Sequence, residues 1–405
     1  MAHLTKVSSL AASILQQMPD VGRWQTKFVL HLFVLWLSIR GRYNFTHLAR
    51  YGKFKESTYR EHFARSFNWL DFNTRLAKQY LSEDRIIALD PSYISKSGKY
   101  SDGVGYYWSG AAGKAKWGQE FCGLAAVDLT DKTALHLLAV QSLDFDVENP
   151  LDYYASILTI NVEDLRQVSD CVVVDAYFSK ARFIDPVVEA GFEVITRLRH
   201  DQVLYYPYNG PRRKGAGAPK KYDGRVDPRN LCADKFFPCC QAADGTWCAY
   251  EGTAYVKAWK RWVRLVVVQN LDTEGKITGH ALFVSTDEQL DGGEIKFRYE
   301  SRFQQEFLYR DAKQELGLED GQAYSWQKID YHLNCSLTVG SLAKAAHHLT
   351  AGAHNDQPFS IADIKTMYVN ENLALRIIRG CGIDADSPII RRLLPKIRKL
   401  GQRRV

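Results

Sequence analysis

Hydrophobic positions over residues 1–80 recur at the spacing of helices. Residues 24–39 are apolar on almost every side, which predicts a helix buried among others. A short helix over 45–51, a turn at Gly52 and a helix over 57–69, capped by its first serine, follow. Two short helices around a glycine turn predict a helix-turn-helix that binds DNA. The alternative is a plain helical bundle with a solvated basic face.

From residue 85 onward the pattern changes to short apolar runs that predict β-strands. These runs span residues 85–90, 121–129, 134–140, 171–175 and 192–198. A helix is predicted between the last two runs, over 181–190. Strands mixed with helices indicate an α/β domain whose central strands are covered on both faces.

The pattern changes again near residue 200. A basic loop punctuated by glycine and proline spans 211–221, and strands are predicted over 246–257, 262–269 and 279–285. Helices resume over 293–316 and 328–349, and the tail 391–404 carries seven Arg or Lys residues. We therefore predict a helical DNA-binding domain (1–80), the first part of a catalytic core (81–200), a β-strand insertion (201–290), the second part of the core (291–350) and a basic helical C-terminal region (351–405).

Composition limits the classes to which the chain can belong. Of its 405 residues, 46% are hydrophobic and 24% are charged, which excludes a disordered or collagen-like chain. The longest apolar run, 28–39, is shorter than the about 20 residues that a membrane span requires. Eight cysteines are too few for a disulfide scaffold and no secretion signal is visible, so we expect a cytoplasmic protein. The net charge of +7 permits a polyanionic partner.

Two acidic residues, Asp90 and Asp175, each end an apolar strand. A carboxylate there either caps the next element or points into a cleft, and two on one sheet can reach one metal site. Glu306, on the helix predicted over 293–316, is the best-placed third acid. Three carboxylates can hold two Mg²⁺ ions, with Mn²⁺ as a substitute, because hard divalent cations prefer carboxylate oxygens. Such ions activate water or a 3'-hydroxyl and stabilise the leaving oxygen of a phosphodiester.

The helix that carries Glu306 has a regular polar face. Its members recur every three or four positions and are Tyr299, Arg302, Glu306, Arg310 and Lys313. The three cations can contact phosphates, and the tyrosine can pack against a strand that is being cut.

The spacing Tyr-x2-Arg-x3-Glu-x6-Lys over 299–313 resembles the signature of the DDE transposases of bacterial insertion sequences, in the insertion-sequence-four group. The segment around Asp90 resembles the family's first-Asp region. The segment around Asp175, with Arg197 and Arg199 after it, resembles the second.

The resemblance covers about residues 85–350. It implies an RNase H-like mixed-sheet catalytic domain with a β-rich insertion between Asp175 and Glu306. It also implies a transposase that binds terminal inverted repeats, cuts their ends and joins the freed 3'-hydroxyls to target DNA, as a homodimer in a bacterial nucleoid. Two alternatives stay open: a transposon-derived DNA-binding or regulatory protein, and an RNase H-like nuclease without strand transfer.

Basic and aromatic positions are expected to contact double-stranded DNA. They are Tyr299, Arg302, Arg310, Lys313, Lys114, Lys116, Arg60, Arg65, Arg197 and Arg199, together with the basic loop over 212–221. In the resembled family an insertion tryptophan can stack on a flipped base, which makes Trp247, Trp259 and Trp262 candidates. Cysteines 232, 239, 240 and 248 lack the paired CxxC spacing of a zinc site, so buried thiols are favoured over a metal.

Overall fold

The computed structural model describes residues 2–142, 149–211, 218–351 and 358–403. Its N-terminal end is helical. The helices there are α1 (Ala2–Leu15), α2 (Arg23–Ser38), α3 (Phe45–Tyr51), α4 (Glu56–Phe63) and α5 (Trp69–Tyr80).

The single helix predicted over 57–69 is wrong. Helix α4 ends at Phe63, because the Ala64 N–H bonds to a carbonyl only three residues back and so tightens the last turn. A new helix, α5, then begins, because the Asn68 side chain accepts the Asp71 N–H and caps its first turn.

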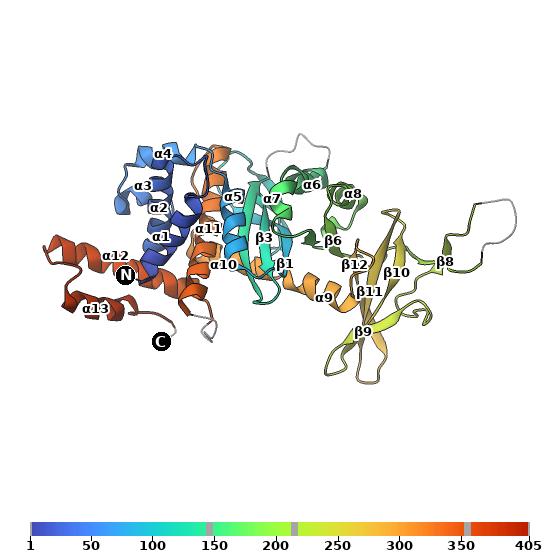
Figure 1. Ribbon diagram of the computed structural model, residues 1–405. Coiled ribbons are helices and arrows are strands. Elements are labelled where there is room, and N and C mark those ends of the chain that lie inside the picture. The colour runs from blue at the N-terminus through green and yellow to red at the C-terminus, as the bar shows by residue number, and fades with distance from the viewer. Residues whose placement is uncertain (1, 143–148, 212–217, 352–357, 404–405) are drawn as a thin grey trace.

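Within the described residues, one 12-stranded mixed sheet forms the centre of the molecule (Figure 1). Its strands are β1 (Arg85–Ser95), β2 (Gly105–Ser109), β3 (Lys114–Asp128), β4 (Thr133–Gln141), β5 (Cys171–Val174), β6 (Glu193–Leu198), β7 (Leu204–Pro207), β8 (Tyr222–Arg225), β9 (Phe237–Gln241), β10 (Trp247–Val256), β11 (Arg261–Leu271) and β12 (Ile277–Ser285). The order of hydrogen-bonded neighbours is β2-β3-β1-β5-β6-β12-β11-β10-β7-β8, with β4 beside β3 and β9 beside β10. The α/β class is confirmed, and the strands of the insertion continue the same sheet through the antiparallel pairing of β12 with β6.

The remaining helices pack around this sheet and at the helical end (Figure 1). They are α6 (Pro150–Ile160), α7 (Val162–Arg166), the 3-10 turn η1 (Ala176–Phe178), α8 (Ala181–Glu189), α9 (Gly292–Ser301), α10 (Gln304–Glu315), α11 (Trp326–Ala351), α12 (Ile361–Gly380) and α13 (Pro388–Arg398). The continuous helix predicted over 293–316 is wrong: it is broken at Arg302 and Phe303. There the N–H groups of Phe303 and Gln305 bond to carbonyls three residues back, which interrupts the α-helical ladder.

The N-terminal helices share one hydrophobic core with the sheet and the C-terminal helices. The indole N–H of Trp36 donates to the Leu316 carbonyl at 2.8 Å, just after α10. In α11 the Tyr331 ring lies 4.5 Å from the Phe63 ring and 5.0 Å from the Trp69 ring, measured between centroids. The first contact ties α2 to the end of α10, the helix that carries Glu306, and the other two hold the helical end against α11.

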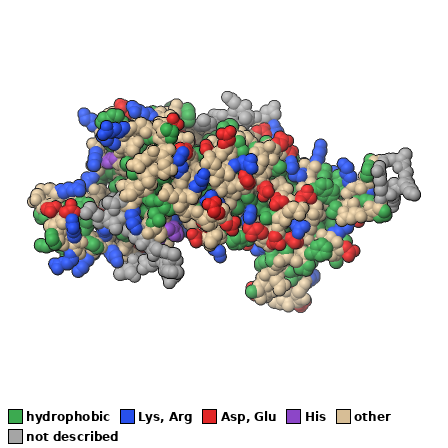
Figure 2. Space-filling model, in the orientation of Figure 1, with side chains coloured by type: hydrophobic (Ala, Val, Ile, Leu, Met, Phe, Trp, Pro, Cys, Tyr) green, Lys and Arg blue, Asp and Glu red, His purple; other side chains and the backbone are tan. Residues whose placement is uncertain are grey.

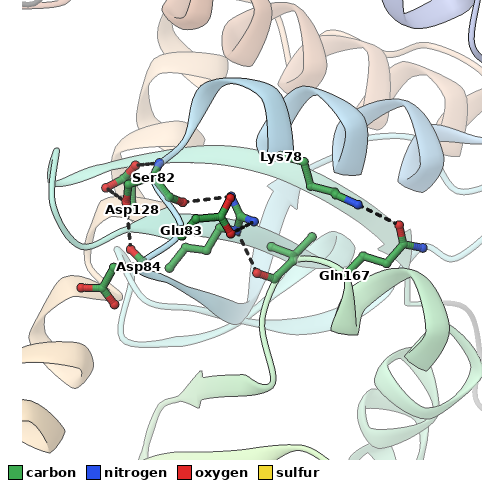
Figure 3. Close-up of polar contacts among 8 residues, drawn as sticks. Lys78, Ser82, Glu83, Asp84, Asp128 and Gln167 are labelled. Atoms are coloured by element: carbon green, nitrogen blue, oxygen red, sulfur yellow. Dashed lines mark hydrogen bonds and ion pairs between the residues drawn. The ribbon is translucent and has the colours of Figure 1, made fainter.

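The start of β1 is held by a group of polar contacts (Figure 3). Asp128, the last residue of β3, accepts hydrogen bonds from the backbone N–H and the hydroxyl of Ser82 at 2.6 and 2.9 Å. Arg85, the first residue of β1, donates to the carbonyls of Val168 and Ser82 at 2.8 and 2.9 Å. Because these bonds join β1 to β3 and to the segment before β5, they help to set the register of the strand that carries Asp90.

Candidate functional site

Asp90 lies in β1 opposite Gly123 of β3. The Tyr309 hydroxyl donates to the Asp90 carbonyl at 2.8 Å and occupies the space beside Gly123. A Cβ at that glycine would lie 2.2 Å from this hydroxyl, so no larger residue fits there without a shift. Gln305 completes the contact by donating to the Gly123 carbonyl at 2.8 Å and to the Tyr309 hydroxyl at 2.7 Å. Helix α10 is thus held directly on the strand that carries Asp90.

Asp175 follows β5 directly and caps the turn η1. Its Oδ1 accepts the backbone N–H of Tyr177 at 2.9 Å, and its carbonyl accepts the Thr196 hydroxyl at 2.8 Å. The capping role that is common for such an acid is therefore present. Among the described residues, no hydrogen bond ties the other carboxylate oxygen to this turn, so capping does not use the whole group.

The first two acids lie at the same level of the sheet. Strands β1 and β5 are parallel, and their last pair sets Ala88 opposite Val173. Asp90 and Asp175 each come two residues after this pair on their own strand. Neighbouring strands lie about 4.8 Å apart, so the same register brings the two residues side by side.

Glu306 reaches the group through Arg302. The Arg302 guanidinium lies 3.4 Å from Asp90 Oδ1 through Nη1 and 3.6 Å from Glu306 Oε1 through Nη2. The Arg302 side chain is only 13% exposed, and its buried Nε has no hydrogen-bond partner among the described residues. An arginine cation therefore bridges two of the three acids.

The electrostatics of Asp90 report the proximity of all three acids. Burial raises the pKa of Asp90 to about 7, the Arg302 cation opposes this, and the charges of Asp175 and Glu306 raise it further. The negative charges of two other carboxylates thus disfavour ionisation of Asp90, and a bound cation would favour it.

Other members of the predicted polar face divide between the site and the solvent. The Tyr299 ring packs 4.9 Å from the Phe283 ring, and Lys313 Nζ donates to the Tyr93 carbonyl at 2.7 Å, three residues after Asp90. Arg310 lies apart: it is exposed and contacts the Phe307 ring and the Asp311 carboxylate. Because the helix is interrupted at Arg302 and Phe303, the five positions are divided between α9, the break and α10, and they do not form the single stripe that the sequence predicted.

A cation-lined pocket of about 390 Å³ opens beside Asp175. Its lining includes Arg197, Arg199, Tyr299 and Arg302, all predicted to contact DNA. It also includes His200 and His280, which the sequence analysis missed. Neither histidine lies in a motif, and only the pairing of β12 with β6 brings His280 to this place.

A fourth carboxylate near the acids was also missed. Glu120 lies in β3, and its Oε1 accepts hydrogen bonds from the Tyr154 hydroxyl at 2.6 Å and the Ser142 hydroxyl at 3.0 Å. Burial raises the pKa of Glu120, and its charge in turn contributes to the raised pKa of Asp90. Glu120 lies in the middle of a strand and does not end an apolar run, so the pattern that indicated Asp90 and Asp175 could not indicate it.

The other residues predicted to contact DNA lie away from the acids. Lys114 and Lys116 are exposed at the start of β3, and Arg65 is exposed after α4. Arg60 is paired with Glu56 at 2.6 Å. On the face drawn in Figure 2, Lys and Arg side chains gather over the helical end near α3, α4, α12 and α13. Most of the loop over 212–221 lies outside the described residues.

No group of three or more His, Cys, Asp or Glu side chains in the described residues lies close enough together to hold a metal ion. In the insertion, the sulfurs of Cys239 and Cys240 are 3.9 Å apart, whereas the Cys248 thiol contacts Tyr250 and Gln269. Of the insertion tryptophans, Trp259 is buried and donates to the Ser179 carbonyl.

Searches of protein-family models and of curated proteins each found no match to this chain. Across the described residues, none of the helices combines the length and the apolar character needed to cross a membrane.

Asp90→Asn should stabilise the folded protein at pH 8. The unfolded chain loses the Asp90 proton near its ordinary pKa of 3.8, whereas the folded protein keeps it until about pH 7. The wild type therefore loses stability as the pH rises from 4 to 7, and asparagine removes this loss. We expect a gain of about 4 kcal/mol at pH 8 that vanishes near pH 4, measured by urea unfolding at both values.

Glu300→Gln is the matched control, because Glu300 lies on α9 outside the site and, within the described part of the chain, its one ion pair is with Lys296. A gain of equal size at both pH values would contradict the buried charge at Asp90.

Proposed function

We propose that this protein is a metal-dependent transposase that cuts DNA at terminal inverted repeats and joins the freed 3'-hydroxyls to target DNA. The observation that carries this proposal is the placement of the acids. Asp90 and Asp175 lie at one level on adjacent parallel strands, and Arg302 connects Asp90 to Glu306. A cation-lined pocket opens beside them.

The sheet supports an RNase H-like core as the finer description of the fold. Strands β4, β3 and β1 are antiparallel neighbours, and β5 and β6 follow β1 in parallel. The acids come from two adjacent parallel strands, β1 and β5, and from helix α10, which packs on β1 and β3. The strands between residues 201 and 290 are an insertion into this core that extends its sheet.

The chemistry of the donor set suits two Mg²⁺ ions, for which Mn²⁺ can substitute, and the three acids would have to move closer together than in the described structure to share them. Asp90, Asp175 and Glu306 offer only hard oxygen donors, and their charges already act on one another. When bound, the ions supply activation of the attacking oxygen and stabilisation of the leaving oxygen. Without a divalent ion, the Arg302 guanidinium balances the charge of Asp90 and Glu306. We infer that the Arg302 guanidinium would contact a DNA phosphate when divalent ions balance the charge of the acids in its place.

The pocket beside Asp175 supports DNA as the substrate. Arg197, Arg199 and Arg302 supply charge for phosphates, and Tyr299 supplies a ring and a hydroxyl at the same wall. The basic surface near α3 and α4 is the proposed reader of the inverted repeats, with two copies of the chain holding two ends. Arg65 is exposed directly after α4 and is proposed to take part.

Asp90→Asn should abolish cleavage of DNA that carries the inverted repeats flanking the gene, while affinity for that DNA stays within about twofold. The substitution removes a donor oxygen and adds no bulk, and stability rises rather than falls at neutral pH. Cleavage is followed on labelled end DNA in Mg²⁺ and binding by gel shift without it.

Retained cleavage in Asp90→Asn would overturn the proposed site. If the wild type cleaves end DNA but does not join it to a plasmid target, the protein is a nuclease and not a transposase. Binding without any cleavage by the wild type would indicate a regulatory descendant.

Arg302→Ala and Lys313→Ala should each lower the cleavage rate by roughly 100-fold, the scale of a misplaced reacting group. Arg302 faces the acids, and Lys313 lies along β1 just beyond Asp90. Arg310→Ala is the matched control, because its side chain is exposed and faces Asp311. Rates and melting temperatures of the three variants decide the matter, and an equal rate loss in Arg310→Ala would contradict the assignment.

A further inference from the structure

A two-stranded ribbon projects from the sheet beyond the acids. Strand β1 ends at Ser95, opposite Gly118, and β4 pairs with β3 only from Phe121 onward. The first residues of β3 therefore pair with β2 alone, from Lys114 opposite Ser109 to Trp117 opposite Tyr106. Because β1 runs from Asp90 toward this ribbon, its base lies about 17 Å beyond that acid, at 3.3 Å per residue.

Large aromatic side chains of the ribbon and of the loop before it are exposed. Tyr100 is 85% exposed, Tyr106 75% and Trp108 65%. The Tyr106 ring contacts the Trp117 ring across the ribbon at 5.5 Å, which stabilises the pair of strands. Trp108 lies opposite Ala115, so no cross-strand ring covers it. Exposed rings on a free edge strand are costly unless a partner covers them.

Two more exposed rings are fixed beside the base of the ribbon. Tyr324 is 66% exposed and Trp326 is 47% exposed, just before and at the start of α11. Asp102 joins them to the ribbon: its N–H donates to the Tyr324 carbonyl, and its carboxylate accepts the Trp326 N–H, both at 2.8 Å. These two hydrogen bonds hold the segment that carries Tyr324 and Trp326 beside the loop that precedes the ribbon.

The ribbon is also basic. Residues 96–118 contain four lysines and one acid, and that acid is Asp102, whose carboxylate is engaged with Trp326. Lys114 and Lys116 are exposed, and neither has an ion pair among the described residues. Lysine is depleted from protein–protein interfaces, whereas rings combined with cations are typical of sites for unpaired nucleic acid.

We propose that this ribbon, with Tyr324 and Trp326, binds an unpaired stretch of DNA next to the cleavage site. Bases of a duplex hide their faces in the stack, so exposed rings gain most from a strand whose bases are free. Lys114 and Lys116 contact its phosphates. The proposal rests on the proposed function for its partner, DNA, but it concerns binding and needs no cleavage.

The test compares two labelled DNA hairpins, one with a short oligo-dT tail and one without it, by fluorescence anisotropy in the absence of divalent ions. For the wild type, the tail should raise the affinity roughly tenfold, the scale of stacking one or two bases on rings. Trp108→Ala should lose most of this gain, whereas Trp108→Phe should keep it. Lys114→Ala should weaken binding of the tailed hairpin more than binding of the hairpin without a tail, and should lower the salt dependence of the tailed complex.

Trp24→Ala is the matched control, because Trp24 is an equally exposed tryptophan beside a lysine, Lys27, on α2. A tail that adds nothing for the wild type, or a gain that survives in Trp108→Ala, would overturn the proposal. So would a change of oligomeric state in Trp108→Ala with the tail effect intact, which would assign the ribbon to a protein contact. Because no cleavage is measured, these outcomes are independent of the result with Asp90→Asn.

Discussion

The register of β1 is the constraint on which the rest of the candidate site depends. All eleven residues of β1 pair with β3, and the same strand pairs with β5 in parallel. Side chains alternate between faces along a strand, so a slip of one residue would turn Asp90 to the opposite face. The contacts of Arg85 and Asp128 hold the start of β1, and the Tyr309 hydroxyl holds its backbone at Asp90 itself. Helix α10, and Glu306 with it, takes its position from that contact.

An unfavourable charge arrangement is built into this rigid frame. Asp90 is largely buried beside two other carboxylates, which opposes its ionisation, and Arg302 offsets only part of the cost. A sequence under selection for stability alone would place an apolar or neutral residue in this position. Local conflicts of this kind are expected where a site serves a function, because the surrounding structure must hold the charges in place. The conflict at Asp90 is therefore a stronger argument for a site than the acidity of any one residue.

Two features are proposed to contact DNA: the aromatic ribbon beyond Asp90 and the pocket beside Asp175. The topology of the sheet explains the position of both. Parallel strands β1 and β5 both point their carboxyl ends the same way, so β1 runs past Asp90 to the aromatic ribbon and β5 ends at Asp175 beside the pocket. The insertion contributes one wall of that pocket through β12, which pairs with β6. A strand of DNA could thus meet positive charge before and after the acids without any rearrangement of the sheet.

The sequence by itself determined the α/β class and the positions of most strands, because apolar runs depend on local pattern. It predicted that the first of these strands ends at Asp90, whereas β1 continues to Ser95 through its pairing with β3. It did not determine where helices break: the interruption at Arg302 and the end of α4 follow from short-range hydrogen bonds that leave no mark on hydrophobic spacing. Only the tertiary structure brought Glu120 and His280 toward the acids, since strand pairing decides which distant residues become neighbours. It also decided that the insertion joins the central sheet and that Arg302, rather than solvent, lies between two of the acids. These outcomes depend on contacts between residues far apart in the chain, and no local pattern encodes them.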